Sequence, residues 1–192
     1  LSGIRIVYEY KRAVKFRFGK YVSLLKPGFR WIIPVVDRIQ LVDIRVITIN
    51  IQKQEVMTKD NVPCHINGVF FFKIDDATKA ILQVEDFVFA ISQMAQATLR
   101  DVCGKVELDT ILSEREEIGR NIKNIVELET KIWGISIQDV KIKDIELPEN
   151  MKRSMANQAE AERSRRARII LAEAEEQAAS KLLQAGKIID ES

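Results

Sequence analysis

Histidine and cysteine are the residues of this sequence best suited to catalysis. His65 is the only histidine and directly follows Cys64, so the pair suggests a cysteine nucleophile with a histidine base. Both residues fall in a segment rich in β-branched and aromatic residues, where a strand is expected. Adjacent residues of a strand point to opposite faces, so the two side chains should diverge. The sequence therefore favours an ordinary strand position over a catalytic pair.

Metal and cofactor chemistry find little support. A single histidine excludes a site built from several histidines, and Cys64 and Cys103 form no CxxC pair of the kind that holds zinc or exchanges disulfides. Both cysteines are expected to be buried, inert thiols of a protein in a reducing compartment. The glycines are isolated and form no phosphate loop. The prediction is therefore no catalytic residue, no cofactor and no metal ligand.

Ser113 and the acids around it have a structural explanation. Ser113 lies three residues before Glu116, which is the spacing of a helix capping box. The neighbouring acids fall where a helix is expected to begin, and the helix macrodipole favours them there: Glu107, Asp109, Glu114, Glu116 and Glu117. The sequence thus indicates a helix start rather than a nucleophile with an acid–base pair.

Four arginines between residues 163 and 168 raise the question of nucleic-acid binding. Two acids lie one turn upstream, and Glu162 and Arg166 have the i,i+4 spacing that stabilises a helix. No aromatic residues alternate with the arginines to stack on bases. Pairing along or between helices is the preferred interpretation, and nucleic acid is not expected as a partner.

The N-terminal cations are a different case. The first thirty residues carry many lysines and arginines against the single acid Glu9. Val14, Phe16 and Phe18 alternate with Lys15 and Arg17, which predicts a strand with one wet, basic face. Each cation near anionic lipid would contribute about 1 kcal/mol. The predicted membrane-facing residues are Arg12, Lys15, Arg17 and Lys20.

Aromatic residues accompany these cations along the first thirty-one positions of the chain. They suit the headgroup level of a membrane, where amphipathic rings collect, and equally suit a protein core. The sequence leaves both alternatives open for the group, which consists of Phe16, Phe18, Tyr21, Phe29 and Trp31.

Changes of hydrophobic period predict the elements that position these residues. Period-2 segments predict strands over 14–18, 29–33, 39–51, 55–58, 62–74 and 135–145, with a hairpin turn at 59–61. Apolar residues three and four apart predict helices over 86–103, closed by Gly104, and 118–132. Phe70 to Phe72 suggest a strand covered on both faces. The predicted fold class is α+β, a mostly antiparallel sheet with helices packed on one face, followed by a long C-terminal α-helix.

That helix is expected over 148–192, and the chain is expected to divide into domains 1–147 and 148–192. Strong helix formers fill the segment, which is too long for a small domain to bury alone. One apolar stripe is predicted to bind the same helix of the next subunit: Ile170, Ala174, Ala178, Leu182, Ala185 and Ile189. Its mean spacing of about 3.8 residues favours nearly straight or slightly right-handed packing over a dimeric zipper.

Eight blocks in order resemble the stomatin, or SPFH (band 7, prohibitin-homology), family: EYKRAVKFRFGK, KPGFRWIIPVVD, VDIRVITI, QEVMTKDNV, TLRDVCGK, LSEREEI, WGISIQDVKIKDIELPENMKRSMANQAEAER and AEAEEQAA. The resemblance spans almost the whole chain. Small departures are Lys26 before Pro-Gly, and Cys64 and Gly68 in a strand usually filled by valine or alanine, where Gly68 suggests a bulge.

The resemblance implies a non-enzymatic, membrane-associated scaffold that homo-oligomerises and organises membrane microdomains. An adaptor that regulates a membrane protease or ion channel through the globular domain is the alternative, and a soluble enzyme is disfavoured. The implied partners are anionic lipid, an NfeD-type membrane protein, a membrane serine protease or an ion channel. The chain begins at Leu1 and its apolar runs are too short to span a bilayer. The resemblance implies a hydrophobic anchor that precedes the domain, which fits this start, with the domain on the cytoplasmic side.

Overall fold

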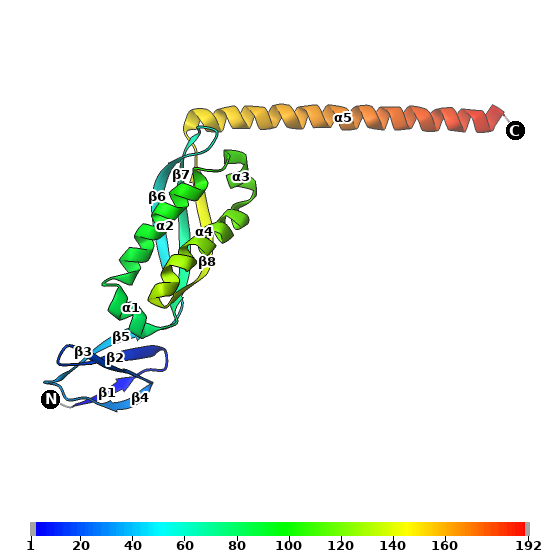
Figure 1. Cartoon of the computed structure of the whole chain (residues 1–192). Coiled ribbons are helices and arrows are strands. Elements are labelled where there is room, and N and C mark those ends of the chain that lie inside the picture. Colours follow the sequence, from blue (N-terminus) through cyan, green and yellow to red (C-terminus); the bar gives the residue numbers. More distant parts are fainter. Residues whose placement is uncertain (1–2, 191–192) are drawn as a thin grey trace. The chain divides into compact units, whose positions relative to one another are not determined.

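The computed structural model describes residues 3–190, except for the side chains of residues 183–190. The chain divides into two compact units, Leu1–Glu146 and Leu147–Ser192. Within the described residues, the first unit contains three antiparallel sheets and four α-helices, and the second is one long helix (Figure 1). These elements confirm the predicted α+β fold class, its antiparallel pairing and its long C-terminal helix.

Residues 4–43 form two small sheets. Their strands are β1 (Ile4–Val7), β2 (Lys11–Arg17), β3 (Lys20–Leu25), β4 (Gly28–Trp31) and β5 (Asp37–Asp43). β1 and β4 form a two-stranded ribbon, and the other three pair in the order β3-β2-β5. The β2–β3 hairpin turns at Phe18 and Gly19, which both have positive φ. Phe18 therefore belongs to the turn and not to the strand predicted over 14–18.

The third sheet has the order β6-β7-β8, made of β6 (Ile47–Met57), β7 (Pro63–Ile74) and β8 (Ile135–Glu146). The hairpin predicted around residues 59–61 joins β6 to β7 and is confirmed. The single strand predicted over 39–51 is wrong, because the chain leaves one sheet and enters another there. Asp43 stabilises the break, since its Oδ1 accepts a hydrogen bond from the backbone N of Arg45 at 2.9 Å.

Helices cover one face of this third sheet (Figure 1). The first unit contains α1 (Ala77–Gln83), α2 (Phe87–Cys103), α3 (Leu108–Ser113), α4 (Arg115–Thr130) and the 3-10 helix η1 (Lys131–Trp133). Phe70 and Phe72 of β7 are fully buried, whereas Phe71, on the other face, is only half-buried. The expectation that this strand is covered on both faces is therefore wrong. α4 approaches β8 closely at Gly119, where an added Cβ would lie 2.5 Å from the carbonyl oxygen of Val140.

Caps explain where these helices begin and end. Asp86 caps α2 by accepting a hydrogen bond from Phe89 N, and Gly104 closes that helix as predicted. The predicted capping box of Ser113 and Glu116 is wrong. Ser113 is the last residue of α3, and its hydroxyl donates to the carbonyl of Asp109 at 2.7 Å. The short helix α3 was not expected, and Glu114 precedes α4 without a side-chain cap.

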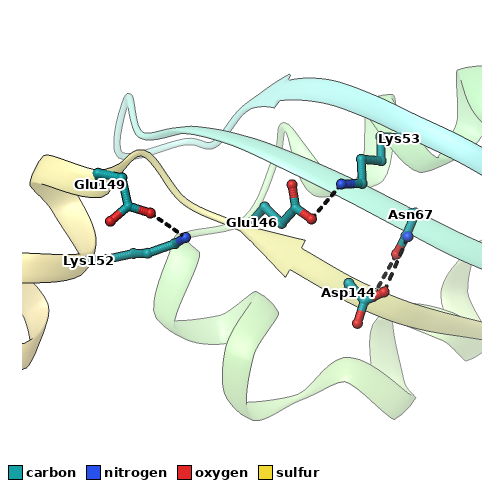
Figure 2. A network of polar contacts seen from close by, with 6 residues as sticks. All are labelled: Lys53, Asn67, Asp144, Glu146, Glu149 and Lys152. Carbon is teal, nitrogen blue, oxygen red and sulfur yellow. Dashed lines mark hydrogen bonds and ion pairs between the residues drawn. The ribbon is translucent and has the colours of Figure 1, made fainter.

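At one end of the third sheet, β6 and β7 each have a β-bulge, and a side chain at each bulge contacts β8 (Figure 2). Asn67 lies at the shift in β7, next to Gly68 as the sequence suggested, and its Oδ1 accepts from Asp144 N of β8 at 2.7 Å. Lys53 lies at the shift in β6, and its Nζ pairs with Glu146 of β8 at 2.5 Å. These contacts tie the end of β8 to both other strands, including β6, which does not pair with it directly.

Candidate functional site

Asp37 gathers two of the predicted membrane-facing cations. Its Oδ2 lies 2.7 Å from Lys15 Nζ, and its Oδ1 accepts from Arg17 Nε at 2.8 Å. Ile33 N also donates to Oδ2 at 3.2 Å. The Asp37 side chain is 0% exposed, against 13% for Lys15 and 44% for Arg17. Hydrogen bonds from Arg17 and then Lys15 outweigh desolvation and hold the pKa of the Asp37 carboxyl well below its ordinary value.

This cluster changes the expected basic face. Lys15 and Arg17 do project to the same side of β2, but that side carries a buried carboxylate, so it is not the wet face that the alternation predicted. Arg12 instead donates to the carbonyls of Glu9 and Lys11, and Lys20 is exposed at the start of β3. The structure thus brings together two of the four predicted cations, around an acid that lies twenty residues along the chain from Arg17.

The β1–β4 ribbon exposes a compact apolar face that the sequence analysis did not recognise as one surface. Ile4 pairs with Trp31 and Ile6 with Phe29, so strand alternation places all four side chains on the same face. Their exposed fractions are 60%, 53%, 78% and 84% for Ile4, Ile6, Phe29 and Trp31. Period-2 alternation is the sequence signal that groups Ile4 with Ile6 and Phe29 with Trp31, each within its own short segment.

The N-terminal aromatic residues, for which the sequence allowed either the membrane headgroup level or the protein core, are mostly at the surface. Phe16 is half-buried, whereas Phe18, Tyr21, Phe29 and Trp31 are exposed. Four of these five residues are therefore not part of the core of the first unit.

Helix α5 (Glu149–Asp190) carries the predicted oligomerisation stripe. Ile170, Ala174, Ala178 and Leu182 are exposed, whereas the side chains of Ala185 and Ile189 lie outside the described part of the chain. Ile169 and Leu171 are exposed as well and were missed. Because successive helical residues are about 100° apart, residues 169–171 spread apolar surface well beyond one stripe.

The arginines of α5 pair along their own helix. Glu162 Oε1 accepts from Arg166 Nε at 2.9 Å, which confirms the predicted i,i+4 pair, and Arg165 Nη2 lies 2.9 Å from the same oxygen. These bonds lower the pKa of Glu162 to about 2, with the bond from Arg165 as the largest cause. Two of the four arginines between residues 163 and 168 thus have a carboxylate partner within the helix.

The cysteines and the histidine occupy ordinary positions. Cys64 and Cys103 are buried and free, as expected, and burial raises the pKa of Cys103 to about 12 and also raises that of Cys64. His65 is exposed, so the divergence of Cys64 and His65 is confirmed. No group of three or more His, Cys, Asp or Glu within the described residues is arranged to hold a metal ion. None of the described helices is long and apolar enough to cross a membrane.

Comparison with known proteins places these features in a family. Residues 5–176 match the family described as SPFH domain / Band 7. The chain belongs to this SPFH/band 7 family. A stomatin homologue of Pyrococcus abyssi is 49% identical over 190 residues, which cover 99% of this chain and 71% of that protein. Stomatin of Mus musculus is 39% identical over 191 residues, 98% of this chain and 67% of that protein. Membership of the SPFH family supports a membrane-associated, scaffold-like role.

Proposed function

We propose that this SPFH-family chain is a non-enzymatic scaffold that homo-oligomerises through α5 and organises a patch of membrane on the cytoplasmic side. The proposal rests on the exposure of α5 to solvent. The helix has 42 residues, about 63 Å at 1.5 Å per residue, and residues 163–182 are all exposed. Helices in proteins derive most of their stability from packing an apolar face, so a partner for α5 is expected.

The distribution of apolar residues on α5 favours several neighbouring copies over a simple pair. A two-stranded coiled coil needs one narrow seam. Ile169, Ile170 and Leu171 are all exposed and lie on different sides of the helix, so one neighbour would leave part of this surface in water. A ring or cluster, in which each α5 contacts a copy on either side, would bury more of it.

A second candidate is an adaptor that regulates a membrane protease or ion channel through the first unit. The observation in its favour is an apolar row on the outer side of α4 and η1, where Ile125, Leu128 and Ile132 are exposed. Their spacing of three and four residues is that of one helix face, which suits a partner's apolar groove or helix. An NfeD-type membrane protein, a membrane serine protease or an ion channel would be the partner.

The scaffold proposal predicts that Ile170→Glu with Leu182→Glu lowers the mass of the assembly toward the 22.0 kDa of one chain. Two carboxylates would have to lose their hydration in any helix–helix contact along the stripe, which is unfavourable without a cation beside them. Multi-angle light scattering after size exclusion measures the mass, and circular dichroism checks that the sheets are intact.

The matched control is Ala172→Glu with Ala179→Glu, which adds the same two charges at exposed positions on the side of α5 that lies away from Ile170 and Leu182. The control should keep the assembly mass. An unchanged mass in the stripe variant would refute self-association through α5. A membrane partner recovered equally well by the wild-type chain and the dissociated variant would favour the adaptor.

A further inference from the structure

Strand β8 is an outer strand of the third sheet, so one of its two edges has no strand beside it. Helix α4 lies against β8 and covers part of this edge (Figure 1). Gly119 of α4 lies against the carbonyl oxygen of Val140. Lys123 Nζ donates to the carbonyl oxygen of Gln138 at 2.9 Å, and the Asp139 carboxylate accepts from Val140 N at 2.9 Å. The edge is therefore closed as far as Val140.

The edge opens again at Ile142. In an antiparallel pair, residues that bond the neighbouring strand alternate with residues whose N–H and C=O point away from it. Val140 is of the second kind, since its N–H and C=O meet Asp139 and α4. Ile142 follows two residues later in unbroken register with β7, so its N–H and C=O also point to the edge. Within residues 3–190, no turn, helix or side chain is bonded to these two groups.

A hollow of about 530 Å³ lies beside the open edge, between β8 and the first turns of α4. Three cations line it, Arg115 and Arg120 from α4 and Lys141 from β8, together with two acids. Lys141 Nζ lies 3.6 Å from the carboxylate of Asp139. The other acid, Glu116, precedes Arg120 by four residues but does not pair with it. No carboxylate of the described residues forms an ion pair with Arg115 or Arg120, so both guanidinium groups are available to an anion.

We propose that this edge and hollow bind the last residues of a partner's polypeptide chain, with the peptide backbone paired to Ile142 and the C-terminal carboxylate bound by Arg115 and Arg120. A strand added to an open sheet edge gains backbone hydrogen bonds, and guanidinium groups form strong, charge-assisted bonds with carboxylates. The inference goes beyond the self-association proposed for α5 and gives the first unit a site that recruits other proteins.

The closed part of the edge selects a chain end over an internal segment. An added strand that pairs with Ile142 cannot continue past Val140, because Gly119 occupies that side of β8. Arg120 follows Gly119 directly, so a cation lies where the peptide must stop. A terminal carboxylate is attracted to the cations of the hollow, whereas a terminal ammonium group is repelled by them. The site therefore fits a C-terminus.

The test uses the immobilised full chain and a pool of random hexapeptides, prepared once with a free C-terminal carboxylate and once as the C-terminal amide. The free acids should be retained about tenfold more strongly, since the amide cannot form the charge-assisted bonds. Arg115→Gln with Arg120→Gln should abolish this preference. Glu116→Gln should increase it about threefold, because an acid that repels the carboxylate leaves the hollow.

The matched control is Arg163→Gln with Arg168→Gln, which removes two exposed arginines of α5 that pair with no carboxylate among the described residues. It should keep the preference for free acids. Failure to retain either pool, equal retention of acids and amides, or an equal loss in the control would overturn the proposal. Light scattering on the same variants gives the assembly mass, so a failed peptide site remains distinguishable from failed self-association through α5.

The backbone contact is measured by hydrogen exchange resolved to single amides. The amide of Ile142 should exchange about tenfold more slowly with the best-retained free acid than without it, because the peptide backbone then accepts its hydrogen bond. Val140 is the internal reference, since its N–H is already bonded to the Asp139 carboxylate. An Ile142 amide whose exchange stays the same when the peptide binds would show that no strand is added to β8 and would refute the proposal.

Discussion

Asp37→Asn should lower the thermal unfolding midpoint of the β1–β5 region more than removal of any other single carboxylate there. Asparagine keeps the shape of the side chain but not its charge. Lys15, whose side chain is 13% exposed, would then be held in a nearly closed site without a counter-charge, and Arg17 would lose its paired acceptor. Breaking a buried ion pair on one side is destabilising because the remaining charge stays desolvated.

The matched control is Asp43→Asn. Asp43 also pairs with an arginine, since its Oδ2 lies 2.6 Å from Arg45 Nη2, but this pair is local and more exposed. Exposed pairs contribute little to stability. Hydrogen exchange of the β2 and β5 amides, together with thermal melting, would measure both variants. Equal effects would show that Asp37 is not the residue that holds these strands together.

Asp37 should also make the stability of this region depend on acid pH. The cations beside it lower its pKa in the folded chain, whereas the unfolded value is about 4. The unfolded state therefore binds the proton more readily. The contribution of Asp37 is fully present above about pH 4 and is lost as the pH falls below that value. Melting between pH 2 and 7 should show a steeper acid decline for the wild type than for Asp37→Asn.

The Asp37 cluster also shows what the sequence could not reveal. Alternation predicted that Lys15 and Arg17 share a face, and they do. The acid between them could not be found, because Arg17 and Asp37 are neighbours only through the β2–β5 register, across two intervening strands. Local periodicity carries no information about register between distant segments. It likewise could not tell which face of β1 and β4 the rest of the chain would leave uncovered.

Long periodic segments were predicted well, and short ones were not. The helix over 86–103 and the strand over 135–145 match α2 and β8 closely, since each has many apolar positions in one period. Helices α1 and α3 have 7 and 6 residues, too few turns for a period to emerge. Missing α3 had a direct consequence, because Ser113 was then assigned as the cap of the next helix.

Gly134→Ala should be among the most destabilising alanine substitutions in the first unit, with an expected loss of about 3 kcal/mol in the free energy of unfolding. Gly134 has φ = 69°, where a side chain costs roughly 1–2 kcal/mol. An added Cβ would also lie 2.6 Å from Asp76 Cβ and 2.9 Å from the Asp76 carbonyl oxygen. Crowding of this kind costs about 1–3 kcal/mol. Urea denaturation would measure the loss.

Gly19→Ala separates the two causes. Gly19 also has a positive φ, 79°, but an added Cβ would meet nothing within 4 Å, so only the backbone strain of about 1–2 kcal/mol should appear. The extra loss at Gly134 should come from Asp76, which caps α1 through Thr78 N and Lys79 N and whose own N–H donates to the carbonyl of Gly134. Moving Asp76 aside would disturb both contacts. Equal losses in the two variants would mean that Asp76 yields freely, and that the α1 cap does not depend on the glycine beside it.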